Sequence, residues 1–490
     1  SRRRHTRYIS VTGVQTCALP ISSDVRTPDG PVANSDSRNG FGSIGGAWTG
    51  AKHYFGASYG YDDTRYGTPV VEGGAISLTP RRHAISVRSG GEQLSGVFES
   101  YRATLAVRRY KHDELNLGEV DTAFTNNTEE FEGMGAHRAF GRLKGSLGGW
   151  ALNGAFYAQG EESLSPAVGQ KGMAAFAYEE ASWPHVTLQF GGRIDHARYT
   201  PAGETERRFT TGSGSLGALF RPAAAQDRLV LAVSVARAAR YPALEELFYY
   251  GLHAGNFAFE VGSPTLRPEH ALGVDAAIRW QAPRVSGELT YFRNNVSGYI
   301  FRQPLSAAEF AARVPGYSVR FDGREGIATR ADEVLQSDEA LPIIEYLAQD
   351  SVLQGIEAHA DVTLTEKLSA EVGLDYVRGT VANSGDPLPR IPPVRGRAGL
   401  RYQRNAFQVG GDLVVTGAQD RLAPNETTTD GYQLARVYAA YSAQTGGAVS
   451  TWTVRVDNLT NELYRNHLSL IKDYAPEMGR NIKVLYSLKF

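Results

Sequence analysis

The chain ends with NIKVLYSLKF, from Asn481 to Phe490, and this stretch decides the fold class. Successive side chains of an extended strand point to opposite faces, so a period of two in polarity indicates a strand. Here one face is apolar and the other is polar, with Leu485 as the exception. The stretch is therefore predicted to be an amphipathic strand with an aromatic end. Its apolar face consists of Ile482, Val484, Tyr486, Leu488 and Phe490.

The same alternation recurs along the chain. It is found in DRLVLAVSV (227–235), KLSAEVGLDY (367–376) and NAFQVGGDLVV (405–415). A soluble β-sandwich would alternate in the same way. Alternation alone therefore does not distinguish a lipid-facing sheet from a sheet packed on a protein core.

The connections between these strands separate the two alternatives, because short and long connections take turns along the chain. Short turns on one side and long loops on the other are typical of outer-membrane barrels. We predict an all-β fold, a large antiparallel up-and-down transmembrane β-barrel with about 19 strands. The short connections are 90–93, 182–185, 281–284, 365–367, 403–405 and 442–447. The long ones include 62–80, 240–266, 303–341, 381–391, 418–429 and 459–480.

Composition and motifs exclude several function classes. The formal net charge is -1, so no basic excess indicates nucleic-acid binding. No run of about 18 apolar residues is present, which excludes a transmembrane helix but not a barrel. Cys17 is the only cysteine, so no disulfide or cysteine metal cluster is expected. SGSLG (213–217) lacks the leading Gly of a nucleophile elbow, and we expect neither enzyme activity nor a cofactor.

The first residues differ in character from the rest. Residues 1–22 have a basic start and a broken apolar stretch, which fits neither a signal peptide nor a strand. We interpret them as a non-native, unstructured leader and residues 23–490 as the barrel domain. The first recognisable strand, near Phe41 to Thr49, would start on the long-loop side, whereas bacterial barrels have an even strand count. We therefore expect an N-terminally truncated barrel, with about 19 of about 22 strands and no plug domain, and a parallel seam or an open gap between its first and last strands.

Two stretches resemble a known family. RAARYPALEELFYYGLHAGNFAFEVGSPTLRPEHALG (237–273) is similar to the R-A-P-x-x-x-E-L-F and F-E-x-G-N-P-x-L-x-P-E segments of TonB-dependent outer-membrane receptors. Tyr241 stands where the family usually has Ala, and Ser263 where it usually has Asn. VDNLTNELYRNHLSLIKDYAPEMGRNIKVLYSLKF (456–490) resembles their last two strands and the loop between them. The resemblance covers the chain from Arg26 onward.

The resemblance implies a receptor in the outer membrane of a Gram-negative bacterium. Such a receptor takes up a metal or metal chelate (siderophore, haem, cobalamin or zinc), driven by the TonB complex through an N-terminal region that would precede this chain. HLSLIKDYAP (467–476) resembles the form found in a zinc-type subgroup. The resemblance also implies a monomer in outer-membrane lipid, and a last strand, ending at Phe490, that the barrel assembly machinery recognises. The alternative is a passive porin-type channel, which would need no plug.

The long-loop side offers candidate substrate-binding residues. A zinc site needs three or four converging His or carboxylate ligands, and aromatic side chains could stack on a siderophore or haem. Each lone His also fits an ordinary polar rim, and the aromatic residues also fit an interfacial belt. The candidates are His112, Tyr249, Tyr250, His253, Phe257, His467 and Asp473.

A second cluster is predicted inside the barrel. In GIEAHADVTL (355–364), Glu357, His359 and Asp361 share the polar face of a strand, and the next strand adds further carboxylates. This cluster could hold a metal ion in transit. Alternatively, it is a hydrated wall that meets the plug.

Overall fold

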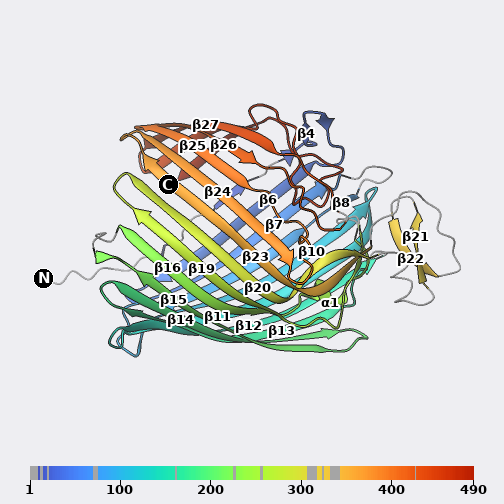
Figure 1. The fold of residues 1–490 in the computed structure, drawn as a ribbon, viewed down its shortest axis with the longest axis horizontal. Helices are drawn as coiled ribbons and strands as arrows, with labels where there is room; N and C mark the ends of the chain where they lie inside the picture. The colour runs from blue at the N-terminus through green and yellow to red at the C-terminus, as the bar shows by residue number, and fades with distance from the viewer. Residues whose placement is uncertain are drawn as a thin grey trace.

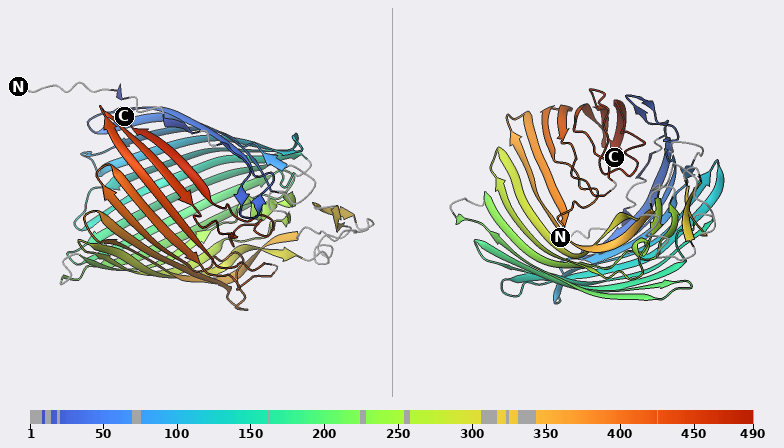
Figure 2. Two further views of the ribbon diagram at one scale, coloured as in Figure 1. Left: turned by 90° about the horizontal axis from the view of Figure 1, so that it is seen from above. Right: turned by 45° about the vertical axis from the view of Figure 1, so that its right-hand side comes forward.

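The chain forms one large antiparallel sheet that curls into the wall of a barrel (Figures 1 and 2). No helix among the described residues is long and apolar enough to cross a bilayer. The computed structural model describes residues 9–10, 15–18, 21–69, 76–160, 163–223, 228–253, 258–305, 317–322, 325–330, 343–424 and 426–489.

The wall is a continuous series of long strands, each antiparallel to the next. Its members are β6 (Ser37–Thr49), β7 (His53–Gly67), β9 (Arg81–Gly91), β10 (Phe98–Asn116), β11 (Glu119–His137), β12 (Leu143–Gly160), β13 (Val168–Ser182), β14 (Val186–Pro201), β15 (Arg207–Phe220), β16 (Leu229–Arg240), β19 (Glu269–Gln281), β20 (Val285–Leu305), β23 (Ile343–Thr363), β24 (Leu368–Val381), β25 (Arg395–Arg404), β26 (Phe407–Thr416), β27 (Tyr432–Thr445), β28 (Ala448–Asp457) and β29 (Asn481–Lys489).

Smaller elements complete the fold. β8 (Ile76–Leu78) pairs with β7 and β10, and the hairpin of β17 (Tyr250–His253) and β18 (Ala258–Val261) pairs with β23 in parallel. The remaining elements are the helix α1 (Leu244–Phe248), the hairpin of β21 (Tyr317–Asp322) and β22 (Glu325–Arg330), and the short pair β4 (Arg26–Thr27) and β5 (Gly30–Pro31).

The outward face of the wall is apolar. Residues paired across strands share a face, as Val233 of β16, Ala276 of β19 and Tyr291 of β20 do. Val233 is 48% exposed and Tyr291 43% exposed. The outward sets predicted by period-two alternation are confirmed on β16, β24 and β26. Their exposed members include Leu231, Val233, Val235, Val372, Leu374, Tyr376, Phe407, Val409, Leu413 and Val415.

The inward face is polar and carries paired charges. On β26, Leu413 points outward, whereas its neighbour Asp412 points inward and is bound by Arg436 Nη2 at 2.6 Å. On β14, Arg193 Nη2 and Asp195 Oδ1 lie 2.6 Å apart. A polar interior and an apolar exterior are the arrangement of a barrel that spans a bilayer.

The connections gather at two ends of the wall. At the turn end, brief turns join β13 to β14, β19 to β20, β25 to β26 and β27 to β28. At the loop end, long segments join β16 to β19, β20 to β23, β26 to β27 and β28 to β29, as predicted. The connection between β10 and β11 at the loop end is tight. It uses the left-handed residues Leu117 (φ 52°) and Gly118 (φ 91°), which suit a two-residue hairpin.

The first and last strands of the wall, β6 and β29, do not pair with each other in the described residues, and Figure 2 shows the gap between them. The expected open gap is thus found rather than a parallel seam. The other edge of β6 carries three short antiparallel strands. The expectation that residues 1–22 are unstructured is wrong for these segments, because their backbones pair with β6. They are β1 (Ile9–Ser10), β2 (Gln15–Ala18) and β3 (Ile21–Ser22).

Candidate ligand-binding site at the loop end

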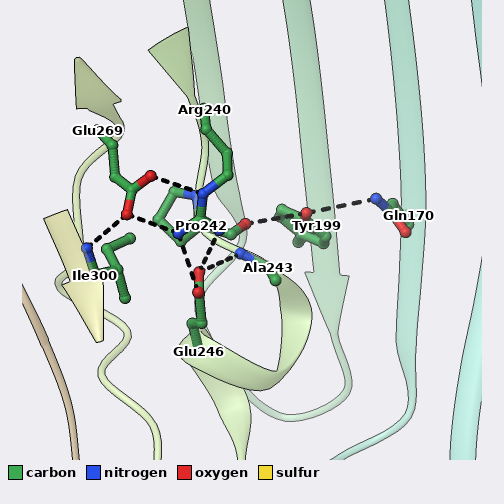
Figure 3. A network of polar contacts seen from close by, with 8 residues as sticks. All are labelled: Gln170, Tyr199, Arg240, Pro242, Ala243, Glu246, Glu269 and Ile300. Atoms are coloured by element: carbon green, nitrogen blue, oxygen red, sulfur yellow. Dashed lines mark hydrogen bonds and ion pairs between the residues drawn. The ribbon is translucent and has the colours of Figure 1, made fainter. Parts of the chain in front are cut away.

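A charge network fastens α1 to the wall where the loop from β16 to β19 leaves it (Figure 3). Arg240, the last residue of β16, is the register partner of Glu269, the first of β19. The Arg240 guanidinium donates to both oxygens of Glu269 at 2.8 Å and to both oxygens of Glu246 at 2.9 and 3.1 Å. Glu269 also accepts a 2.5 Å hydrogen bond from Ile300 N. One arginine therefore ties the helix to two strands.

The sequence before α1 supplies its start signal. Pro242 fixes the backbone ahead of the helix, and Ala243 N donates to Glu246 Oε2 at 2.8 Å, one half of a capping box. Glu245 and Glu246 place negative charge in the first turn, which the helix dipole favours. The Pro242 carbonyl accepts a 3.1 Å hydrogen bond from the Tyr199 hydroxyl on the inward face of β14. The helix is thereby held inside the mouth of the barrel.

An apolar cluster fills the mouth beneath α1. Leu247 is fully buried, and Phe248 meets Tyr199 edge-on with ring centroids 6.2 Å apart. Tyr249, a predicted site residue, packs against this cluster, and burial raises the pKa of its hydroxyl. The buried members are Val168, Tyr199, Phe209, Leu244, Leu247, Phe248, Leu266 and Ile300. Tyr249 therefore contributes to packing rather than presenting a free ring to a ligand.

The other residues predicted in this loop are placed differently. Tyr250 is 44% exposed, and its N donates to Leu164 O at 2.7 Å. His253 ends β17, but its side chain lies outside the described residues, as does the whole of Phe257. The structure thus places both Tyr249 and Tyr250 at the mouth of the barrel.

The β17–β18 hairpin adds a buried carboxylate that sequence reasoning missed. Glu260 is fully buried, accepting 2.9 Å and 2.8 Å hydrogen bonds from Arg302 Nη1 and the Tyr346 hydroxyl. Since a buried charge is stable only when it is paired, this contact fastens the hairpin to the wall.

His112 lies apart from the other candidates, on the inward face of β10. Its ring stacks on Phe124 with centroids 4.4 Å apart, and Nε2 is 3.8 Å from Glu114 Oε1. Its buried Nδ1 has no hydrogen-bond partner in the described part of the chain. His112 thus lies near one carboxylate, and its ligand role stays a prediction.

His467 and Asp473 both contact the loop between β26 and β27. His467 Nδ1 is 3.1 Å from Thr429 Oγ1, and its Nε2 is 3.8 Å from Glu426 Oε1. Asp473 accepts hydrogen bonds of 2.7 and 2.9 Å from Thr427 Oγ1. The His467 side chain is 1% exposed. This burial lowers the pKa of His467, which favours the neutral imidazole, and its buried Nε2 has no hydrogen-bond partner in the described part of the chain.

A cavity of about 520 Å³ joins this loop to the inward face of the wall. His467 and Glu477 line it from the loop, while Glu357 and Asp375 line it from β23 and β24. Burial raises the pKa of Glu477, because desolvation disfavours the charged carboxylate. The structure therefore brings together a loop candidate and an interior candidate that the sequence left separate.

A second cavity of about 600 Å³ continues along the wall, and Glu357 lines both. His359 and Asp361 line this second cavity, so the predicted interior cluster does face the lumen. Arg397 and Arg395 pair with Glu371 and Asp375 there. Within the described ranges, no group of three or more His, Cys, Asp or Glu could hold a metal ion unaided.

Several residues of the site escaped sequence reasoning. Glu426, Tyr464 and Glu477 reach His467 or its cavity only through packing of two loops. Tyr464 and Glu477 did lie in the quoted C-terminal stretch, and their place in the same loop as His467 was the available signal. Arg240 and Glu246 lay in the other quoted stretch, where their spacing indicated the family but not their contact.

Comparisons with known proteins agree with this architecture. Structural neighbours include the copper transporter OprC (18% identity, 96% of this chain, 76% of that chain, TM-score 0.76). A second is the FrpB iron transporter of Neisseria meningitidis (14% identity, 99% of this chain, 76% of that chain, TM-score 0.71). A third is a mutant of the ferric enterobactin receptor PfeA of Pseudomonas aeruginosa (18% identity, 95% of this chain, 71% of that chain, TM-score 0.67).

At these identities the neighbours show the fold alone, and all three are receptors or transporters rather than enzymes. The family described as TonB dependent receptor-like, beta-barrel matches residues 16–461. That family resides in the outer membrane of Gram-negative bacteria and is not enzymatic. Because the match spans most of the sequence, this chain belongs to the TonB-dependent receptor β-barrel family.

Proposed function

We propose that this protein is an outer-membrane receptor that binds a metal or metal chelate at its loop end and imports it with energy supplied through TonB. The observation that carries the proposal is the 520 Å³ cavity where His467 and Glu477 face Glu357 and the Asp375–Arg395 ion pair of the inner wall. The names of the structural neighbours, which refer to copper, iron and ferric enterobactin, support a metal-bearing ligand.

The chemistry of the cavity suits such a ligand. Imidazole and carboxylate groups bind zinc, copper and iron, and His467 and Glu477 offer one of each. Arg395 and Tyr432 add a cation and a phenol that can bind the oxygen atoms of a chelate. We propose that the ligand enters here and moves towards the second cavity past Glu357.

The remaining parts of the proposal rest on the family. A TonB-contacting region and a plug would lie upstream of the wall, and the intact barrel would be a monomer with about 22 strands. The barrel assembly machinery would recognise the strand ending at Phe490. We do not propose the passive porin alternative, because the family match and the structural neighbours are receptors and transporters.

Calorimetric binding to the purified, plug-containing receptor tests the site, with Zn²⁺, Cu²⁺ and a ferric catecholate as probes. His467→Ala and Glu477→Gln should each weaken binding of the probe that the wild type binds most tightly by at least tenfold, or about 1.4 kcal/mol. His185→Ala at the turn end is the matched control and should leave binding unchanged. Failure of all three probes to bind, or equal affinity for wild type and His467→Ala, would refute the assignment.

A further inference from the structure

The outward face of the wall carries a row of basic side chains near the loop end. Arg198 points outward, because it lies on the same face of β14 as the exposed Ile194. Its register partners on the neighbouring strands, Lys171 and Arg208, therefore point outward as well. Arg237, Arg293 and Arg378 lie on the same face of later strands. The basic row consists of Lys171, Arg198, Arg208, Arg237, Arg293 and Arg378, on β13, β14, β15, β16, β20 and β24.

Towards the loop end, the basic row begins where the apolar part of the outward face ends. On three strands that run towards the loop end, the basic residue is the next outward residue after an exposed apolar or aromatic one. On these strands the last apolar or aromatic side chain before the basic residue is about 40% exposed, which places it on the lipid-facing surface. The row therefore lies at the level of the lipid headgroups. The three pairs are Val235 and Arg237, Tyr291 and Arg293, and Tyr376 and Arg378.

The positive charge of the row is largely unmatched. In the described part of the chain, Glu206 is the one carboxylate paired with it, accepting a 2.6 Å hydrogen bond from Arg198 Nε and another from Arg208. Like charges directly opposite each other on neighbouring strands destabilise a sheet. The adjacent cations Lys171, Arg198 and Arg208 therefore favour binding of a further anion.

Other members of the row have neutral partners. Arg237 Nη1 donates to Gly212 O at 3.2 Å, and Arg293 Nη1 donates to Gln354 Oε1 at 3.0 Å. Neither contact neutralises the guanidinium. Both arginines therefore keep their full charge at the lipid-facing surface.

Basic residues on the same face of β9 and β10 are compensated instead. Each of the three has its own carboxylate, so this group has no unmatched positive charge. The pairs are Arg81 Nε and Asp63 Oδ1 at 3.7 Å, Arg109 Nη2 and Glu129 Oε1 at 2.7 Å, and Lys111 Nζ and Asp113 Oδ1 at 3.2 Å. This contrast supplies a matched control within one chain.

We propose that the basic row binds the phosphate groups of phosphorylated lipids in the leaflet at the loop end. Guanidinium groups match phosphate in geometry and charge. Neighbouring strands lie about 4.8 Å apart, so one headgroup with two phosphates can contact cations on several strands. The inference rests on the membrane location of the barrel and is independent of the transported substrate.

The test is lipid retention by the intact receptor, purified from outer membranes in non-ionic detergent and analysed by native mass spectrometry. The probes are bisphosphorylated lipid A, its dephosphorylated form and inorganic phosphate. Lys171→Gln/Arg198→Gln/Arg208→Gln should reduce retained lipid A at least tenfold. Arg81→Gln/Arg109→Gln/Lys111→Gln should change it less than twofold.

Two further variants separate binding from assembly. Arg198→Lys/Arg208→Lys keeps the positive charge and should retain the lipid. If the triple variant fails to assemble, Arg237→Gln/Arg293→Gln replaces it and should lower the amount of retained lipid A. Equal retention by wild type and the row variants, or equal loss in the β9–β10 control, would overturn the proposal. So would complete displacement of the lipid by millimolar inorganic phosphate, or equal retention of dephosphorylated lipid A.

Discussion

Arg240→Ala is expected to release α1 from the wall while leaving the barrel folded. The substitution removes the hydrogen bonds from Arg240 to Glu246 and Glu269, and it leaves Glu269, which is 8% exposed in the wild type, without its arginine partner. Hydrogen bonds to charged groups contribute about 1.5–3 kcal/mol each to stability, whereas exposure of the pair reduces this value. Since the Arg240 side chain is 44% exposed, we expect a total loss of about 2–3 kcal/mol.

Hydrogen–deuterium exchange of the purified receptor measures this loss locally. A loss of about 2–3 kcal/mol corresponds to roughly 30- to 150-fold faster exchange of the α1 amides. Arg279→Ala is the matched control, because Arg279 also pairs with a glutamate, Glu288 at 3.1 Å, but far from α1. Unchanged exchange in α1 after Arg240→Ala, or equal acceleration by Arg279→Ala, would show that Arg240 does not hold α1 to the wall.

Three further predictions follow from the loop contacts. The folded-state pKa of His467 is lowered from 6.5 by burial and by Lys472, so its stabilising effect is present above pH 6.5 and is lost as pH falls. Protection of residues 458–480, calculated relative to the intrinsic exchange rate at each pH, should therefore fall below that pH, and His467→Asn should remove this dependence. Tyr199→Phe deletes the hydrogen bond to Pro242 and should speed α1 exchange about fivefold, for a loss of about 1 kcal/mol. Glu260→Leu removes the carboxylate that pairs with Arg302, whose side chain is 15% exposed, and should destabilise the β17–β18 hairpin by about 3 kcal/mol. Limited proteolysis should then cleave this hairpin faster, and unchanged cleavage would contradict the prediction.

The architecture of the wall could be predicted because its causes are local. Alternation in 367–376 and 405–415 specifies which side chains face lipid, and a one-residue register slip would bury charge in the bilayer. The lengths of the connections then distinguish the turn end of the wall from the loop end. The paired segments before β6 could not be predicted, because Ile9–Ser10 and Gln15–Ala18 lack a strand pattern and gain their structure from a neighbouring edge.

The candidate site could be predicted only in part, because its residues converge through tertiary contacts. His467 was a candidate from its residue type, but its proximity to Glu426 and Glu357 depends on how two loops pack against the wall. Tyr249 has the residue type of a stacking platform, yet it packs beside the α1 cluster. Spacing along the chain contains no direct record of such long-range contacts.

TonB-driven import is tested by the accumulation of the radiolabelled metal, or of its chelate, in isogenic cells that express the full receptor with and without TonB. We predict that removing TonB lowers accumulation to the level of cells that lack the receptor, while binding at the cell surface persists and still depends on His467. Equal accumulation in the two strains would contradict the account and would indicate a passive channel.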